Sequence, residues 1–129
     1  MSENKQTVLN FIEAWNSGDA ENILDFLHTD CVFHCMPLAP ARGIDAIRRM
    51  IRIVLEPAGK VDWVLHNIAE SPEGVVFTER TDRYLIDNKW IEHPVTGVFE
   101  LIGGRIVSWR DYFDLNYFED QIPAEHSED

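Results

Sequence analysis

The chain has 129 residues, of which 45% are hydrophobic and 26% are charged, and its formal net charge is -12 at pH 7. This length and composition predict a single globular domain over residues 1–129, and no apolar run approaches the ~20 residues of a membrane span. The negative charge would repel nucleic acid and anionic membranes, which argues against both as partners. We therefore expect a small, neutral or apolar ligand.

The N-terminal residues and the cysteines indicate the compartment. Residues 1–6 lack the apolar core of a signal peptide, so we expect a cytoplasmic protein. Cys31 and Cys35 fall on the same face of one predicted strand, too far apart along it to pair without distortion. Both thiols are expected to be reduced.

Two helices are predicted at the start of the chain. Residues 2–17 carry apolar side chains at helical spacing, and Gly18 can end this helix in the left-handed conformation. Asp19 can cap a second, shorter helix over residues 20–27. The two helices are expected to pack together and to lead into a strand.

That strand is predicted over residues 31–36, because Pro37 and Pro40 cannot donate to a ladder of hydrogen bonds. A third helix is predicted after Gly43, with apolar residues at helical spacing until Pro57 ends it.

The second half of the chain has the pattern of four strands. The turn signals between them are Ser71-Pro72-Glu73-Gly74, Asp87-Asn88 and Gly103-Gly104, and the strands cover 61–68, 75–86, 89–101 and 105–112. Helices followed by an antiparallel meander predict an α+β fold, with the helices on one face of a curved sheet. Such a cone has an internal pocket. Residues 119–129 are expected to form a loose acidic tail.

The stretch Thr78-Glu79-Arg80-Thr81-Asp82 carries the main chemical signal. Side chains two apart in a strand share a face, so Arg80 and Asp82 point the same way. Apolar residues occur on both faces of this strand, so neither face is expected to be open to solvent, and an enclosed charge needs a partner. Asp111 shares a face with Trp109 in a later strand, and we expect Asp82 and Asp111 to share Arg80. An ion pair that only holds the strand is the alternative.

Four stretches of this sequence resemble the limonene epoxide hydrolase family in order and spacing. They are Met36-Pro37-Leu38-Ala39-Pro40-Ala41, Thr78-Glu79-Arg80-Thr81-Asp82, Gly97-Val98-Phe99 and Trp109-Arg110-Asp111-Tyr112-Phe113-Asp114-Leu115. The resemblance covers nearly the whole chain and implies the NTF2-like, cystatin-like cone of that family. Members are often dimeric and use no metal or organic cofactor. We therefore expect a homodimer without a cofactor or metal.

The resemblance also implies a catalytic set of Arg80, Asp82 and Asp111. A protonated Asp82 would give its proton to the epoxide oxygen, while an ionised Asp111 would deprotonate the attacking water. Arg80 would bridge the two carboxyl groups, and burial would keep one proton on the coupled pair at neutral pH. The implied reaction is one-step hydrolysis of a small or medium apolar epoxide, of terpene or sterol type, without a covalent ester.

Two positions depart from the family pattern. A Tyr and an Asn that hold the water in the family are replaced here by Phe33 and Cys35. Phe33 has no hydrogen-bonding group, and a thiol is only a weak donor and acceptor. By family register, His93 occupies a pocket-lining position on the same strand face as Val95. Its imidazole is a candidate to hold the water or a substrate oxygen from that side.

The predicted substrate-binding residues are therefore Phe33, Cys35, Met36, Leu38, His93, Val95 and Trp109. Cys35 has no identifiable base partner and is expected to be a small buried hydrophobe rather than a nucleophile. Trp15, Trp63 and Trp90 are expected in the core or at an interface.

Two functions compete on this evidence. The Asp-Arg-Asp set favours an epoxide hydrolase, whereas the missing Tyr and Asn favour a non-hydrolytic protein of the same cone. That protein would be an isomerase of the ketosteroid isomerase type or a binding module for apolar ligands. An isomerase would keep carboxylate proton transfer but would need no held water.

Overall fold

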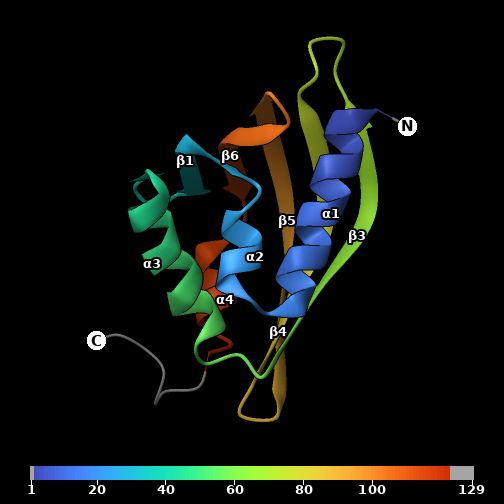
Figure 1. Ribbon diagram of the computed structural model, residues 1–129. Helices are drawn as coiled ribbons and strands as arrows, with labels where there is room; N and C mark the ends of the chain where they lie inside the picture. Colours follow the sequence, from blue (N-terminus) through green and yellow to red (C-terminus); the bar gives the residue numbers. More distant parts are fainter. Residues whose placement is uncertain (1, 123–129) are drawn as a thin grey trace.

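The structure is a computed structural model that describes residues 2–122 (Figure 1). Its elements, in chain order, are α1 (Glu3–Ser17), α2 (Ala20–Leu24), β1 (Leu27–Met36), β2 (Ala41–Arg42), α3 (Ile44–Leu55), β3 (Lys60–Glu70), β4 (Val76–Ile86), β5 (Lys89–Ile102), β6 (Arg105–Tyr112) and α4 (Leu115–Glu119). The predicted α+β class is confirmed. No helix within residues 2–122 has the length and apolar character needed to cross a bilayer.

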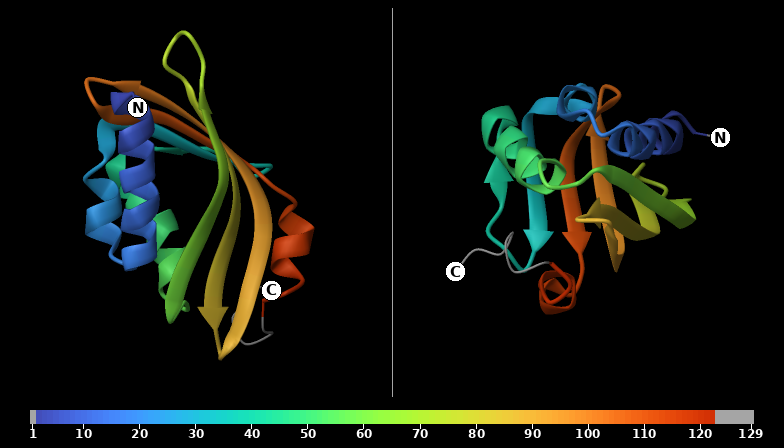
Figure 2. Two further views of the ribbon diagram at one scale, coloured as in Figure 1. Left: turned by 90° about the vertical axis from the view of Figure 1, so that its right-hand side faces the viewer. Right: turned by 90° about the horizontal axis from the view of Figure 1, so that it is seen from below.

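One six-stranded sheet has the order β2-β1-β6-β5-β4-β3. The predicted antiparallel meander runs from β3 to β6, while β1 lies parallel to β6. Figure 2 shows that the sheet is strongly curved and that α1, α2 and α3 lie together on one side of it, as the sequence predicted. Seen from below in Figure 2, α3 and α4 lie on opposite sides of the end of the cone.

Gly18 and Asp19 act at the helix ends as predicted, whereas Ser2, predicted as the first helical residue, is the N-cap of α1. The Ser2 side chain accepts a hydrogen bond from the backbone N of Lys5 at 3.1 Å, and Gly18 adopts a left-handed conformation with φ 75°. The Asp19 side chain caps α2 by accepting from the backbone N of Glu21 at 2.9 Å. These local signals therefore fix the start of α1, its end and the start of α2.

The end of α2 and the start of β1 differ from the prediction. The helix ends at Leu24 rather than at Leu27, and the strand begins at Leu27 rather than at Cys31. The backbone carbonyl of Phe26 accepts from the backbone N of Ile106 at 2.9 Å, which draws the chain into the sheet beside β6. This long-range contact has no local signal in the sequence. The two-residue strand β2 was also not predicted.

The chain after β6 is ordered where a loose tail was expected. The Asp114 side chain caps α4, and the Gln121 side chain both donates to the backbone O of Glu92 at 2.8 Å and accepts from its backbone N at 3.2 Å. Gln121 thus pairs with a stretch of β5 that extends beyond β6. The prediction is therefore wrong for residues 119–122. Residues 123–129 lie outside the described part of the chain.

The inward face of the sheet packs against α1, α2 and α3. Its β4 residues alternate as predicted, with Val76, Thr78, Arg80, Asp82, Tyr84 and Ile86 all buried. The outward face of β4 is open, contrary to expectation, since Phe77 is 41% exposed. The other large buried side chains are Phe11, Ile23, Ile47, Ile51, Ile91, Phe99, Ile106 and Trp109.

Candidate active site

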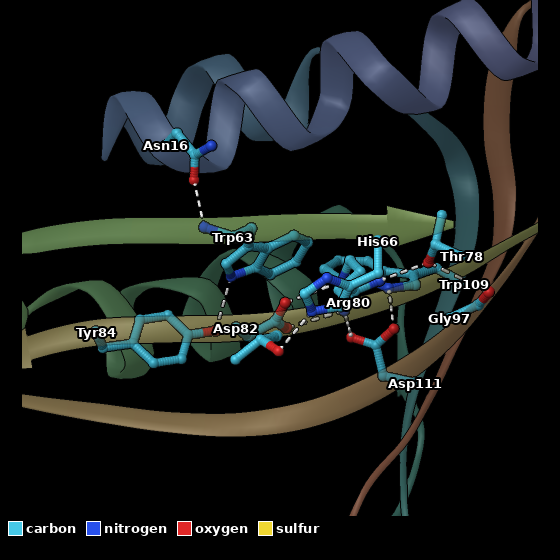
Figure 3. A network of polar contacts seen from close by, with 11 residues as sticks. Asn16, Trp63, His66, Thr78, Arg80, Asp82, Tyr84, Gly97, Trp109 and Asp111 are labelled. Carbon is cyan, nitrogen blue, oxygen red and sulfur yellow. Dashed lines mark hydrogen bonds and ion pairs between the residues drawn. The ribbon is translucent and has the colours of Figure 1, made fainter. Parts of the chain in front are cut away.

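Arg80 is fully enclosed, with 1% of its surface exposed, and its guanidinium contacts two carboxylates (Figure 3). Its Nε and Nη2 atoms donate to the two oxygens of Asp82, each at 2.9 Å. Nη2 also donates to Oδ2 of Asp111 at 3.1 Å. The structure therefore contains the arginine shared by two aspartates that the sequence predicted.

Further groups hold this polar set in place. Arg80 Nη1 donates to the Thr78 hydroxyl at 3.1 Å, and the Trp63 ring lies 4.2 Å from the guanidinium carbon. Trp109 Nε1 donates to Oδ1 of Asp111 at 3.0 Å. Both oxygens of each carboxylate thus accept a hydrogen bond, as buried carboxylates require.

The electrostatics favour one shared proton. Burial raises the pKa of Asp82, and the Arg80 charge only partly opposes this effect. Burial likewise raises the pKa of Asp111, and the charge of Asp82 adds to the rise. Burial by itself would lower the pKa of Arg80, but the two carboxylates raise it above its ordinary value, so the guanidinium stays charged. One cation and two carboxyl groups are neutral together when one proton is shared.

Gly97 leaves the space in which this set fits. A Cβ atom at this position would lie 2.9 Å from both Asp111 Oδ1 and Thr78 Oγ1, and closer still to Arg80 Nη1. The Gly97 carbonyl also faces the Thr78 hydroxyl at 3.5 Å. In the sequence, Gly97 stands out only as part of the stretch Gly97-Val98-Phe99, which resembles the limonene epoxide hydrolase family. Its steric role depends on the pairing of Gly97 with Asp111 and Thr78 on its two neighbouring strands.

A cavity of about 630 Å³ opens above the carboxylates. Asp82 and Asp111 line it, whereas Arg80 lies behind them. Of the predicted substrate-binding residues, those that line the cavity are Phe33, Cys35, Leu38, His93, Val95 and Trp109. Met36 is half-buried and is not part of the lining. The remaining wall is mainly apolar and comes largely from α3 and α4.

Several lining residues were not predicted. Trp15 and Trp63, expected in the core or at an interface, also line the cavity, as does Tyr84. The Trp63 ring nitrogen donates to the Tyr84 hydroxyl at 3.0 Å (Figure 3). Tyr84 shares strand parity with Arg80 and Asp82, so this signal was available in the sequence. Trp63 reaches the site because β3 pairs it with Asp82, which the sequence pattern does not show.

Asp111 has mainly apolar neighbours on the side of β1. Phe33 stacks on Trp109 with ring centroids 3.6 Å apart and 13° between the ring planes. Cys35 is paired with Asp111 across the β1–β6 ladder. Burial raises the pKa of the Cys35 thiol, and the Asp111 charge raises it further, so the thiol is neutral. We call Phe33, Cys35, Trp109 and Asp111 the β1–β6 side of the site.

A second hollow of about 640 Å³ lies between the end of α1, the start of β3 and Trp90. Its two charged residues are Lys60, which is exposed, and Asp62, which is half-buried and forms an ion pair with Arg83 at 2.7 Å. Buried titratable groups with shifted pKa values mark functional sites better than volume does. The cavity above Asp82 and Asp111 is therefore the candidate active site, although the other hollow is as large.

Comparisons with known proteins identify the family of this chain. The family model described as the limonene-1,2-epoxide hydrolase catalytic domain matches residues 2–123. The chain therefore belongs to the limonene epoxide hydrolase family.

Individual relatives support the same assignment. Epoxide hydrolase EphG of Mycobacterium tuberculosis is 33% identical over 107 residues, which cover 81% of this chain and 69% of EphG. A solved structure of an M. tuberculosis LEH-like epoxide hydrolase is 30% identical, covers 90% of this chain and 86% of its own, and has a TM-score of 0.78.

An NTF2-like protein of unknown function from Burkholderia pseudomallei matches with a TM-score of 0.77 at 24% identity. The match covers 88% of this chain and 92% of that chain, and it shows the fold alone. The predicted NTF2-like cone is confirmed.

Proposed function

We propose that this protein is a cofactor-independent epoxide hydrolase that adds water to a small or medium, largely apolar epoxide of terpene or sterol type. The main support for the proposal is the position of Arg80, which forms ion pairs with two buried carboxylates at the wall of a largely apolar cavity. Membership of the limonene epoxide hydrolase family and the likeness to EphG support it.

The proposed reaction uses the shared proton of the carboxyl pair. Asp111 accepts a proton from water as the water oxygen bonds to an epoxide carbon, and the bond from that carbon to the ring oxygen breaks. The electron pair of that bond stays on the ring oxygen, which takes the proton of Asp82. The product is a diol, and the pair again holds one proton, now on Asp111. Transfer of that proton to Asp82 prepares the pair for the next turnover.

The contacts of Arg80 bear on which carboxyl holds the proton at rest. Arg80 makes two hydrogen bonds to Asp82 and one to Asp111, so it stabilises the ionised form of Asp82 more strongly. The family pattern instead gives the proton to Asp82. The acid role of Asp82 therefore requires the proton to move to Asp82 when the epoxide binds, with its oxygen near that carboxyl.

The cavity itself favours a neutral substrate. Its volume of about 630 Å³ lies within the ~300–1,000 Å³ usual for small-molecule sites. Asp82, Asp111 and Glu119 all line it, and no lysine or arginine does within the described residues. A carboxylate or phosphate ligand would meet like charges there.

The test is a panel of neutral epoxides, such as cyclohexene oxide, styrene oxide and limonene oxide, incubated with the protein in ¹⁸O-labelled water. One-step hydrolysis predicts diol that carries the label in the first turnover. Label-free diol in that turnover indicates a covalent ester instead. No diol above the rate of an Asp111→Asn control, from any epoxide, contradicts the hydrolase proposal.

A non-hydrolytic function is the second candidate, and the β1–β6 side favours it. Phe33 and the neutral thiol of Cys35 offer the water almost no polar contact where the family has Tyr and Asn. An isomerase needs only proton transfer by the carboxyl pair. The same assay with β,γ-unsaturated ketones distinguishes the two, because an isomerase moves the double bond and forms no diol.

A homodimer and a cytoplasmic location stay predictions. Light scattering on the purified protein gives the mass of the assembly directly.

A further inference from the structure

His93 is the β5 partner of Asp82, and the charge of Asp111 also acts on its ring. Asp82 and His93 are paired across the β4–β5 ladder, and both side chains face inward. Asp111 is instead paired with Gly97, four residues further along β5, which is about 13 Å away at ~3.3 Å per residue. We call Asp82 and His93 the β4–β5 side of the site. The water-holding positions Phe33 and Cys35 lie on β1, and His93 is paired with neither of them.

His93 is a buried polar group at the cavity wall. It is 6% exposed and it lines the cavity. Its Nδ1 atom is sealed from solvent and has no hydrogen-bond partner among residues 2–122. Aromatic rings surround it, with Phe118 at 4.5 Å and Phe113 at 5.1 Å between centroids. Buried polar groups in native proteins are nearly always satisfied, so a cavity-lining imidazole whose Nδ1 is sealed points to a ligand at its other nitrogen, Nε2.

The surroundings also indicate which nitrogen serves that ligand. A sealed N–H without an acceptor is rarer in proteins than an under-satisfied acceptor, so Nδ1 is the nitrogen without the proton. Nε2 then carries the proton and is the nitrogen available to the cavity. Burial lowers the pKa of His93 to about 4, which makes the ring a neutral donor at pH 7.

We propose that His93 Nε2–H donates a hydrogen bond to the epoxide oxygen, beside the proton of Asp82, and is a further catalytic residue. This inference rests on the proposed function. As the carbon–oxygen bond breaks, negative charge develops on that oxygen, and a fixed donor there stabilises the transition state more than the ground state. The proton that becomes part of the diol still comes from Asp82, and the His93 proton stays on Nε2.

With His93 in this role, the two sides of the site act on different reactants. The β4–β5 side has a carboxyl group and an imidazole for the oxygen that leaves carbon, whereas the β1–β6 side has one carboxylate for the water. This protein would therefore depend more on activating the epoxide than on holding the nucleophile. That balance follows from Phe33, Cys35 and His93 together.

The test compares His93→Leu with His93→Gln, whose amide nitrogen can replace Nε2 as a donor. His93→Leu is expected to lower kcat by about 10²-fold, as removal of an oxyanion donor does. His93→Gln is expected to regain most of that loss. Thermal stability of His93→Leu should equal or exceed that of the wild type, because an unpaired buried nitrogen is removed.

The matched control is His66→Leu on the outer face of β3. The His66 imidazole is exposed and forms a hydrogen bond with the Thr81 hydroxyl at 2.8 Å, so the kcat of this variant should not change.

The outcomes separate this proposal from the hydrolase proposal. If the wild type forms diol and His93→Leu keeps the full kcat, the role of His93 is refuted while the hydrolase stands. If the wild type opens no epoxide, ¹⁵N NMR of the histidine rings decides the donor role alone. Saturating cyclohexanone should shift the Nε2 resonance of a His93 ring protonated at Nε2. An unchanged resonance, or a proton found on Nδ1, overturns the proposal.

Discussion

The β4–β5 side and the β1–β6 side of the site each supply one carboxyl group but surround it differently. Asp82 is held by two hydrogen bonds from Arg80 and has His93 next to it. Asp111 has one hydrogen bond from Arg80, and its β1 neighbour is the thiol of Cys35. The two carboxyl groups are therefore not equivalent, although the same arginine bridges them.

The difference shows that the residues around the two carboxyl groups can change while the central polar set stays the same. The polar set at the centre depends on strands β4, β5 and β6, whose ladders are continuous through Thr78, Arg80, Asp82, Gly97 and Asp111. The neighbouring positions on β1 can change without disturbing that set, because Phe33 still packs well by stacking on Trp109. Replacements there would alter how water is held while the proton chemistry persists.

The largest expected effect comes from removing either carboxylate. Asp82→Asn and Asp111→Asn should each lower kcat for epoxide opening by about 10²–10⁴-fold, because a general acid or base is lost. Steady-state kinetics with far-UV circular dichroism separates this from misfolding. The control is Asp62→Asn, which changes a half-exposed aspartate 2.7 Å from Arg83. Full activity in either site variant would show that the carboxyl group in question does not act.

Removing the bridge should cost stability as well as activity. Arg80→Met leaves two buried carboxyl groups without their cation, and breaking such a buried pair costs about 3–5 kcal/mol of unfolding free energy at pH 8. Arg80 lowers the pKa of both aspartates against the effect of burial, so its removal raises both pKa values further and makes the folded variant bind protons more tightly than the folded wild type. The loss should therefore shrink at pH 5 and grow as pH rises.

Urea unfolding at the two pH values measures this effect. The control is Arg83→Met on the outer face, where an ion pair with partly exposed groups contributes only about 0–1 kcal/mol. An equal loss at pH 5 and pH 8 for Arg80→Met would mean that packing, and not the uncompensated charge, is the cause.

Gly97→Ala tests the position where the two sides meet. The added methyl group must displace Arg80, Asp111 or Thr78, so we expect a stability loss of about 1–3 kcal/mol. Misplacement of the carboxylate should lower kcat by about 10²-fold. Gly59→Ala is the control, since its Cβ would make only an ordinary contact of 3.7 Å with the carbonyl of Leu85. Thermal unfolding and kcat that match this control would rule out the steric role.

The smallest expected effect comes from restoring polar groups on the β1–β6 side. Phe33→Tyr combined with Cys35→Asn should raise epoxide turnover by roughly tenfold, at ~0.5–1.5 kcal/mol for each regained hydrogen bond. The tyrosine ring can keep the stack on Trp109. Diol formation by the double variant is compared with that of Cys35→Asn alone. A neutral or harmful result would show that the water is already held by other groups.

The sequence by itself predicted most of the fold, because its signals are local. Helical spacing, the cap at Asp19 and the left-handed Gly18 predicted the first two helices, apart from the N-cap role of Ser2 and the last turn of α2. Turn signals separated the four strands of the meander, which lie within one or two residues of the predicted bounds. The sequence did not predict β2, α4 or the residue at which β1 enters the sheet, since these depend on contacts between residues far apart in the chain.

For the site, period-2 alternation was enough to place Arg80 with Asp82 and Trp109 with Asp111, because strand parity is a property of the backbone alone. Their convergence on one guanidinium, the space left by Gly97 and the Trp63 ring over Arg80 needed the register between strands. Register is fixed by bulges, by turn geometry and by which strand lies next to which. Only the tertiary structure therefore decided that His93 stands beside Asp82 while Cys35 stands beside Asp111.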